Sequence, residues 1–217
     1  MSYQASPETK DLATIAAGVT ACKKCPLYKG ATHGVPGEGS ANAQIMFIGE
    51  GPGKNEDLQG RPFVGAAGQF LEEMLGLIGL KREQVFITNV VKHRPPNNRD
   101  PSPEEVAACT AAWLTAQLHH IDPVVIVTLG RHSLNHFVAG KQISFCHGKP
   151  MRAQAPDGKR RVFYPLYHPA AALYQGSLRE TLIEDFKKIP AVLRAAKEQR
   201  DKERILREMQ AGDSTRS

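Results

Sequence analysis

The stretch AQIMFIGEGPGKNED, residues 43–57, joins an apolar run to a glycine-rich turn. Residues 45–49 contain no polar side chain, which is typical of a strand buried on both faces of a parallel sheet. Three later segments have a similar apolar character: 85–91, 124–129 and 162–166. Segments with helical spacing lie between them. We therefore predict a three-layer α/β domain with a central four-stranded parallel sheet.

Helices are expected on both sides of this sheet and near both ends of the chain. The expected helices cover residues 6–21, 66–78, 102–118, a short stretch after Gly130, and 177–199, the last kinked or split at Pro190. The pattern contains one core and no internal repeat, so we expect a single domain over residues 1–199. Residues 200–217 are highly charged, and we expect a disordered tail there.

The composition is ordinary for a globular protein, with 217 residues, 41% hydrophobic and 23% charged. No segment approaches the ~18 apolar residues that span a bilayer, and the first residues lack the pattern of a signal peptide. We expect a cytoplasmic monomer with no membrane association. The net charge of +6 favours a polyanionic partner such as nucleic acid, although many basic proteins bind none.

The glycine turn at 49–53 matches neither common nucleotide-binding pattern. A P-loop needs G-x-x-x-x-G-K-[ST], but this turn is one residue too short and Lys54 is followed by Asn55. The dinucleotide pattern G-x-G-x-x-G fails as well, so no nucleotide cofactor is expected. Glu50 would repel a phosphate but suits a neutral polar ligand or a water. A tight turn without any ligand is the alternative.

Polar residues also follow two other expected strands. Ligands of open α/β sheets bind beyond the carboxyl ends of the strands, where segments 49–53, 89–94 and 168–173 should meet. Asn89 offers a donor and an acceptor on one amide, which can recognise the edge of a base. His168 can donate to a developing anion. Taken singly, each has a structural alternative, because such an Asn is more often a cap and such a His more often structural.

The chain has four cysteines: Cys22, Cys25, Cys109 and Cys146. Without an export signal, disulfides are not expected. The pair Cys22-x-x-Cys25 then indicates either half of a metal or cluster site, or a redox pair.

Four segments in combination resemble the iron–sulfur branch, family 4, of the uracil-DNA glycosylase superfamily. They are CKKCPLY from Cys22, GEGPGKNEDLQGRPFVGAAGQFL from Gly49, TNVVKHRPPNNRDPSPEEVAAC from Thr88 and YHPAAAL from Tyr167. The resemblance covers roughly residues 21–188. It implies a four-stranded parallel sheet, extrusion of uracil from DNA, and hydrolysis of its N-glycosidic bond, which starts base excision repair.

The resemblance also implies roles at the matching positions. Glu50 would face the uracil and the attacking water together with the turn formed by Gly49, Gly51, Pro52 and Gly53. Asn89 would bind the N3–O4 edge of uracil, and His168 would donate to O2 as negative charge collects on the leaving base. The residue that activates the water stays open, with Glu50 as the candidate.

Three further roles follow from the same resemblance. Phe63 would stack on the flipped base, and Glu56 would crowd the C5 position and exclude the methyl group of thymine. Leu173 would wedge into the gap that the flipped nucleotide leaves.

The sequence departs from the family at one cluster position, where His93 replaces a cysteine. Histidine can ligate iron. The resemblance therefore implies a [4Fe–4S] cluster with these ligands: Cys22, Cys25, His93 and Cys109. Two alternatives stay open, namely Cys146 as the fourth ligand and zinc in place of the cluster.

A histidine at this position also resembles the branch that traps uracil-DNA covalently. That branch carries a KRRIH insertion, which is missing here. Residues 159–161, Lys-Arg-Arg, look similar but precede the fourth strand, and we interpret them as a strand approach with a phosphate contact as an added role. The leading hypothesis is a monofunctional glycosylase acting on uracil-containing DNA. The alternative is a uracil-DNA-binding protein without turnover or with covalent trapping.

Overall fold

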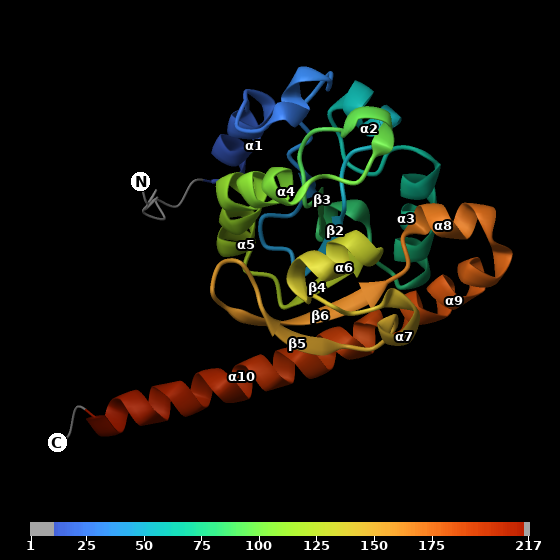
Figure 1. The fold of residues 1–217 in the computed structure, drawn as a ribbon. Helices are drawn as coiled ribbons and strands as arrows, with labels where there is room; N and C mark the ends of the chain where they lie inside the picture. The colour runs from blue at the N-terminus through green and yellow to red at the C-terminus, as the bar shows by residue number, and fades with distance from the viewer. Residues whose placement is uncertain (1–10, 215–217) are drawn as a thin grey trace.

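The computed structural model describes residues 11–214 and contains one mixed sheet of six strands in the order β1-β3-β2-β4-β6-β5 (Figure 1). The strands are β1 (Glu38–Gly39), β2 (Ile45–Gly49), β3 (Phe86–Asn89), β4 (Val125–Leu129), β5 (Met151–Gln154) and β6 (Arg160–Leu166). The four central strands are parallel, which confirms the predicted sheet. Two short antiparallel edge strands, β1 and β5, were not predicted.

Helices cover both faces of the sheet. They are α1 (Leu12–Thr20), α2 (Lys54–Gln59), α3 (Ala66–Leu77), α4 (Pro103–Cys109), α5 (Thr115–Ile121), α6 (Arg131–Phe137), α7 (Ile143–Cys146), α8 (Pro169–Tyr174), α9 (Gly176–Lys187) and α10 (Ile189–Ser214). One π-helical turn, Thr110–Leu114, joins α4 to α5. None of the helices in this described part is both long and apolar enough to cross a bilayer.

Alternation along the strands explains the three layers. In β2, Ile45 and Phe47 pack with α3, α9 and α10, whereas Met46 and Ile48 pack with α1, α4 and α5. Successive side chains of a strand point to opposite faces, so a strand that is apolar at every position must be covered twice. Figure 1 shows α1, α4 and α5 on one side of the sheet and α3, α8 and α9 on the other.

The helix predictions are confirmed in outline. Ser102 caps α4 as expected, because its hydroxyl accepts the Glu105 N–H while the Glu105 carboxylate accepts the Ser102 N–H. The expected long C-terminal helix is split in two, with α9 ending at Lys187 and Pro190 in the first turn of α10. The first expected helix begins at Leu12, and residues 6–10 lie outside the described residues.

The expectation of a disordered tail is wrong for residues 200–214, which continue α10. Ion pairs hold this helix against the sheet and stabilise it along its own surface. Arg152 of β5 pairs with Glu203 through two hydrogen bonds, and Arg204 pairs with Glu208 one turn further along. These charged residues therefore stabilise the helix through ion pairs, although their abundance in the sequence had indicated disorder.

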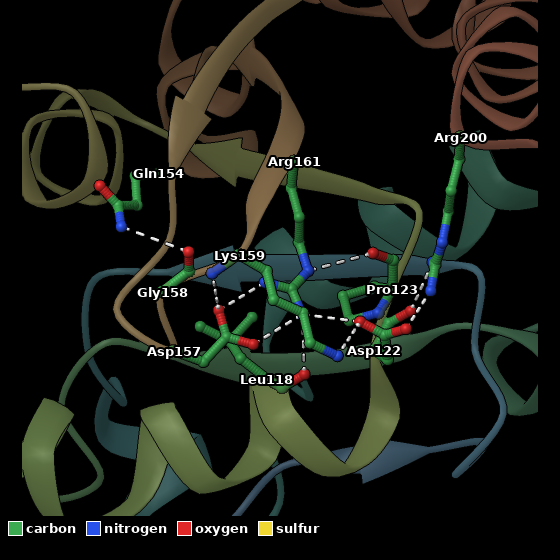
Figure 2. Close-up of polar contacts among 9 residues, drawn as sticks. All are labelled: Leu118, Asp122, Pro123, Gln154, Asp157, Gly158, Lys159, Arg161 and Arg200. Atoms are coloured by element: carbon green, nitrogen blue, oxygen red, sulfur yellow. Dashed lines mark hydrogen bonds and ion pairs between the residues drawn. The ribbon is translucent and has the colours of Figure 1, made fainter. Parts of the chain in front are cut away.

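A buried arginine ties the amino-terminal ends of β4 and β6 together (Figure 2). Arg161 forms ion pairs with Asp157 at 2.5 Å and with Asp122 at 2.9 Å, and it donates to the Leu118 carbonyl at 3.2 Å. Arg200 of α10 pairs with the same Asp122. Because its guanidinium is committed to these partners, the phosphate contact expected at this segment is wrong for Arg161.

Candidate active site

The glycine turn meets the end of β3 at the carboxyl edge of the sheet. Gly49 and Asn89 are register partners in the β2–β3 ladder. A Cβ atom at Gly49 would lie 2.8 Å from Phe63 Cζ and would overlap Asn89 Oδ1. Position 49 therefore requires a glycine, because the Asn89 amide and the Phe63 ring occupy the space that a Cβ atom would need.

Asn89 carries the most informative polar group of this site. The residue is 2% exposed, and its Oδ1 has no hydrogen-bond partner within the part of the chain that the structure describes. An unsatisfied buried acceptor costs about 1–3 kcal/mol, so proteins rarely keep one without a use. The oxygen is suited to accept a hydrogen bond from a ligand N–H.

Phe63 is held in a strained backbone conformation beside Asn89. Its φ of 51° is in the left-handed region that aromatic residues rarely adopt. The Arg82 guanidinium donates to the Phe63 carbonyl at 3.0 Å and also to the Pro62 carbonyl. Arg82 could not be identified from the sequence, because an isolated arginine there gives no sign that it is buried.

Glu56 fixes the other side of the Phe63 loop. Its Oε1 accepts the backbone N–H groups of Val64 and Gly65, both at 2.9 Å, at the start of α3. This carboxylate therefore fixes the two residues that lead into α3, where Gly65 provides no side-chain cap. The expected contact of Glu56 with the C5 position of uracil stays a prediction.

His168 faces Phe63 from the loop after β6. The two ring centroids are 5.6 Å apart with an interplanar angle of 28°. His168 is the N-cap of α8, and its Nδ1 accepts the Ala170 N–H at 3.1 Å. Burial lowers the pKa of His168 to about 4. The ring is therefore neutral near pH 7, with its proton on Nε2, which leaves Nε2–H free to donate to a ligand.

Glu50 lies at the edge of the site, where two residues outside the predicted set, His132 and Asp100, lie near it. His132 Nε2 is 3.9 Å from Glu50 Oε2 and 3.2 Å from Asp100 Oδ1. Burial raises the pKa of Glu50, an effect that His132 opposes and Asp100 reinforces. Glu50 is thus closer to its protonation midpoint at neutral pH than an exposed glutamate would be.

The remaining predicted substrate-binding residues line the turn and the loop after β6. Pro52 is buried, Gly53 is the N-cap of α2, and a Cβ at Gly51 would lie 2.9 Å from Val91 Cγ2. Leu173, the expected wedge, is 41% exposed near the end of α8, next to Tyr174, which is 92% exposed. The structure therefore leaves two apolar side chains at this position available to a partner.

Three of the predicted cluster ligands lie close together on the face of the sheet that α1, α4 and α5 cover. The thiols of Cys22 and Cys25 act electrostatically on Cys109, which ends α4 where the π-helical turn begins. The indole of Trp113 donates to Cys22 Sγ at 3.2 Å, and the backbone N–H of Lys92 donates to Cys109 Sγ at 3.2 Å.

His93 follows Lys92 directly and is 5% exposed. Burial lowers the pKa of His93, which favours the neutral imidazole that binds metals. Cys146 lies elsewhere, in α7, where its thiol donates to the Gln142 carbonyl and its charged neighbours are lysines. The environment of His93 therefore suits a fourth ligand better than that of Cys146.

The four predicted ligands are not drawn together as closely as the ligands of a bound zinc ion would be. Among the described residues, no three of the four predicted ligands bring their ligand atoms within 4.8 Å of one another. A tetrahedral zinc ion with Zn–S bonds of ~2.3 Å would hold its sulfurs roughly 3.8 Å apart. Burial raises the pKa of Cys25, and that of Cys109 to about 11, so metal binding must displace thiol protons.

Comparison with known proteins agrees with this geometry. The family model described as the uracil DNA glycosylase superfamily matches residues 36–194. A type-4 uracil-DNA glycosylase from Sulfurisphaera tokodaii is 51% identical over 79% of this chain and 80% of the relative. Those from Saccharolobus solfataricus and Thermotoga maritima are 46% and 45% identical, over 84% and 81% of this chain and 87% and 91% of the relatives. The chain therefore belongs to the uracil-DNA glycosylase superfamily, and within it to the type-4 uracil-DNA glycosylases.

Proposed function

We propose that this protein hydrolyses the N-glycosidic bond of uracil in DNA and leaves an abasic site. The observation that carries this proposal is the buried, unpartnered Oδ1 of Asn89. Uracil presents an N3–H donor beside its O4 acceptor, and one amide satisfies both. Cytosine presents an acceptor and a donor in the opposite order, so a fixed Asn89 amide rejects it.

Phe63 and His168 complete the base site. An aromatic face contributes about 1–3 kcal/mol to the binding of a stacked base, and the strained Phe63 backbone holds that face in place. The departing uracil takes the electron pair of the glycosidic bond, and its O2 becomes the site of negative charge. The neutral Nε2–H of His168 donates to that oxygen, so no proton has to be transferred before the bond breaks.

Glu50 is the proposed partner of the attacking water. The ionised carboxylate accepts a hydrogen bond from the water and stabilises the positive charge that develops on the sugar. The water oxygen then bonds to C1′, and the proton that it loses balances the charge of the uracil anion. DNA phosphates near the sugar add to the same stabilisation.

A [4Fe–4S] cluster is the proposed cofactor, with Cys22, Cys25, His93 and Cys109 as its ligands. When bound, such a cluster supplies covalent cross-links rather than chemistry on the base. In this chain it would join the segment after α1, the segment after β3 and the end of α4. Three elements that are distant in sequence would then hold the loop from Asn89 to His93.

The test is incubation with an oligonucleotide that contains one uracil, followed by denaturing electrophoresis with and without alkali. We expect free uracil in solution and strand cleavage only after alkali, as for a monofunctional glycosylase. A band retarded under denaturing conditions would instead show covalent trapping. An intact strand after alkali, with no retarded band, would exclude both activities.

A further inference from the structure

Lys92 is a buried lysine between the base site and the proposed cluster. Its side chain is 0% exposed. Its Nζ donates to three neutral oxygens, each at 2.7 Å: Thr88 Oγ1, the Asn89 carbonyl and Gln117 Oε1. Burial of an ammonium among neutral groups is costly and lowers the pKa of Lys92 to about 7. The three short hydrogen bonds to Nζ favour the charged form in return, and an arrangement of this kind calls for a function beyond packing.

The three hydrogen bonds require all three hydrogens of the ammonium. The Asn89 carbonyl and Gln117 Oε1 can only accept, and the Thr88 hydroxyl already donates to the Pro36 carbonyl at 3.1 Å. The amide of Gln117 donates to the same Pro36 carbonyl. Thr88 and Gln117 are therefore each fixed by a second contact, whereas the Asn89 carbonyl is held by the ammonium at the centre of the network.

The Lys92 backbone connects this network to the cluster segment. Its N–H donates to Cys109 Sγ at 3.2 Å, and its carbonyl accepts the Val35 N–H at 2.7 Å. On the other side, the N–H groups of Val90 and Val91 donate to the carbonyls of Gly49 and Glu50. Lys92 thus braces the short loop that begins at Asn89 from the side opposite the glycine turn.

We propose that Lys92 is a positioning residue for uracil recognition, which holds the Asn89 backbone so that the unpartnered amide faces the base. This inference rests on the proposed function. Through the Cys109 contact, the same residue connects the cluster ligands to the residue that recognises the base. Loss of the ammonium frees the Asn89 carbonyl, and the amide then loses its fixed orientation.

The test is a double-mutant cycle between Lys92→Met and Asn89→Ala, measured as single-turnover release of uracil well below the melting temperature. We expect Lys92→Met to lower the rate about 30–100-fold when Asn89 is present, as displacement of a recognition group does. In the Asn89→Ala background we expect less than about a threefold effect, because residues that act through one another are not additive. Equal factors in both backgrounds, or no loss, would overturn the proposal.

Two additional measurements keep the test decisive. Lys187→Met is the matched control, because Lys187 is an exposed lysine paired with Glu184, and its rate should equal that of the wild type. If Lys92→Met does not fold, Thr88→Val removes one partner of the ammonium instead. It should lower the rate about 3–10-fold with the same dependence on Asn89. Equal factors for Thr88→Val in both backgrounds would also contradict the positioning role.

Binding separates this inference from the proposed function. Affinities are measured for oligonucleotides carrying either 2′-fluoro-deoxyuridine, whose glycosidic bond resists hydrolysis, or cytosine at the same position. Lys92→Met should reduce the preference for uracil about tenfold or more, even if the wild type releases no base. An unchanged preference would refute the role of Lys92, whereas inactivity of the wild type alone would refute the proposed function.

Discussion

A methyl group at Gly49 would intrude into the space between the two groups that are proposed to hold the base. The added Cβ would lie 2.8 Å from Phe63 Cζ and closer still to Asn89 Oδ1. Ordinary carbon contacts begin near ~3.5 Å, so the ring must retreat by roughly 0.7 Å and the amide by more. A displacement of about 1 Å in a recognition group costs ~10²-fold in rate, which corresponds to about 2.7 kcal/mol of transition-state stabilisation.

Gly49→Ala should therefore lower kcat/KM for uracil release by about two orders of magnitude. Overpacking of the buried turn should also cost about 1–3 kcal/mol of unfolding free energy, so the assay belongs well below the melting temperature. Gly76→Ala is the control, because this exposed position in α3 has open space around its added Cβ and the helix gains up to ~1 kcal/mol. Activity of Gly49→Ala within about threefold of the wild type would refute the placement of the base against Gly49.

Further predictions concern the leaving group, the water, the cluster and the fold. His168→Ala should lower kcat ~10²–10³-fold in single-turnover assays, because the donor to uracil O2 is lost. Acidification should slow the wild type, because Glu50 takes up a proton at a higher pH than an ordinary glutamate, while His168 stays neutral down to about pH 4. The pH–rate profile should therefore fall on its acid side. Glu50→Gln should remove this fall. Metal analysis should find iron in His93→Cys and in Cys146→Ala but less in His93→Ala. Arg161→Met leaves a buried carboxylate without its cation and should cost about 3–5 kcal/mol in urea unfolding, with the rate of uracil release in the cold unchanged.

Each of these predictions would be contradicted by a particular result. A His168→Ala rate near that of the wild type would remove this residue from leaving-group stabilisation. If the rate of Glu50→Gln still falls at low pH, the titrating group is a residue other than Glu50. Full iron content in His93→Ala, or iron loss in Cys146→Ala, would change the ligand set. A slower Arg161→Met enzyme of unchanged stability would show that the network of Figure 2 serves the reaction rather than the fold.

The parallel core could be predicted from the sequence because four apolar runs alternate with helical segments. The edge strands could not, because β1 has two residues and includes Gly39, and β5 contains Arg152 and Gln154 and has a partner on one side only. Edge strands are exposed on one side, so their sequences resemble loops. The charged end of α10 was wrongly predicted to be disordered for a related reason. Composition does not show which charged side chains form ion pairs in the folded chain.

The site residues that belong to motifs could be located from the sequence, because parallel strands end at one edge of the sheet. Arg82 and Lys92 could not, since cations are expected in water and their burial depends on the folded chain. One signal for Lys92 was present, namely its place directly after Val90 and Val91 at the end of an apolar run. The partners of Glu50 were also missed, because His132 comes from a helix that carries no motif.

The central claim is that the unpartnered Oδ1 of Asn89 recognises the N3–H of uracil. The most direct measurement compares base release from two oligonucleotides that differ only by uracil or cytosine at one position, for the wild type and for Asn89→Ala. We expect release of uracil but not of cytosine by the wild type, and a fall of ~10²-fold or more in the uracil rate of Asn89→Ala. Equal release of both bases by the wild type, or an Asn89→Ala rate within about threefold of it, would contradict the account.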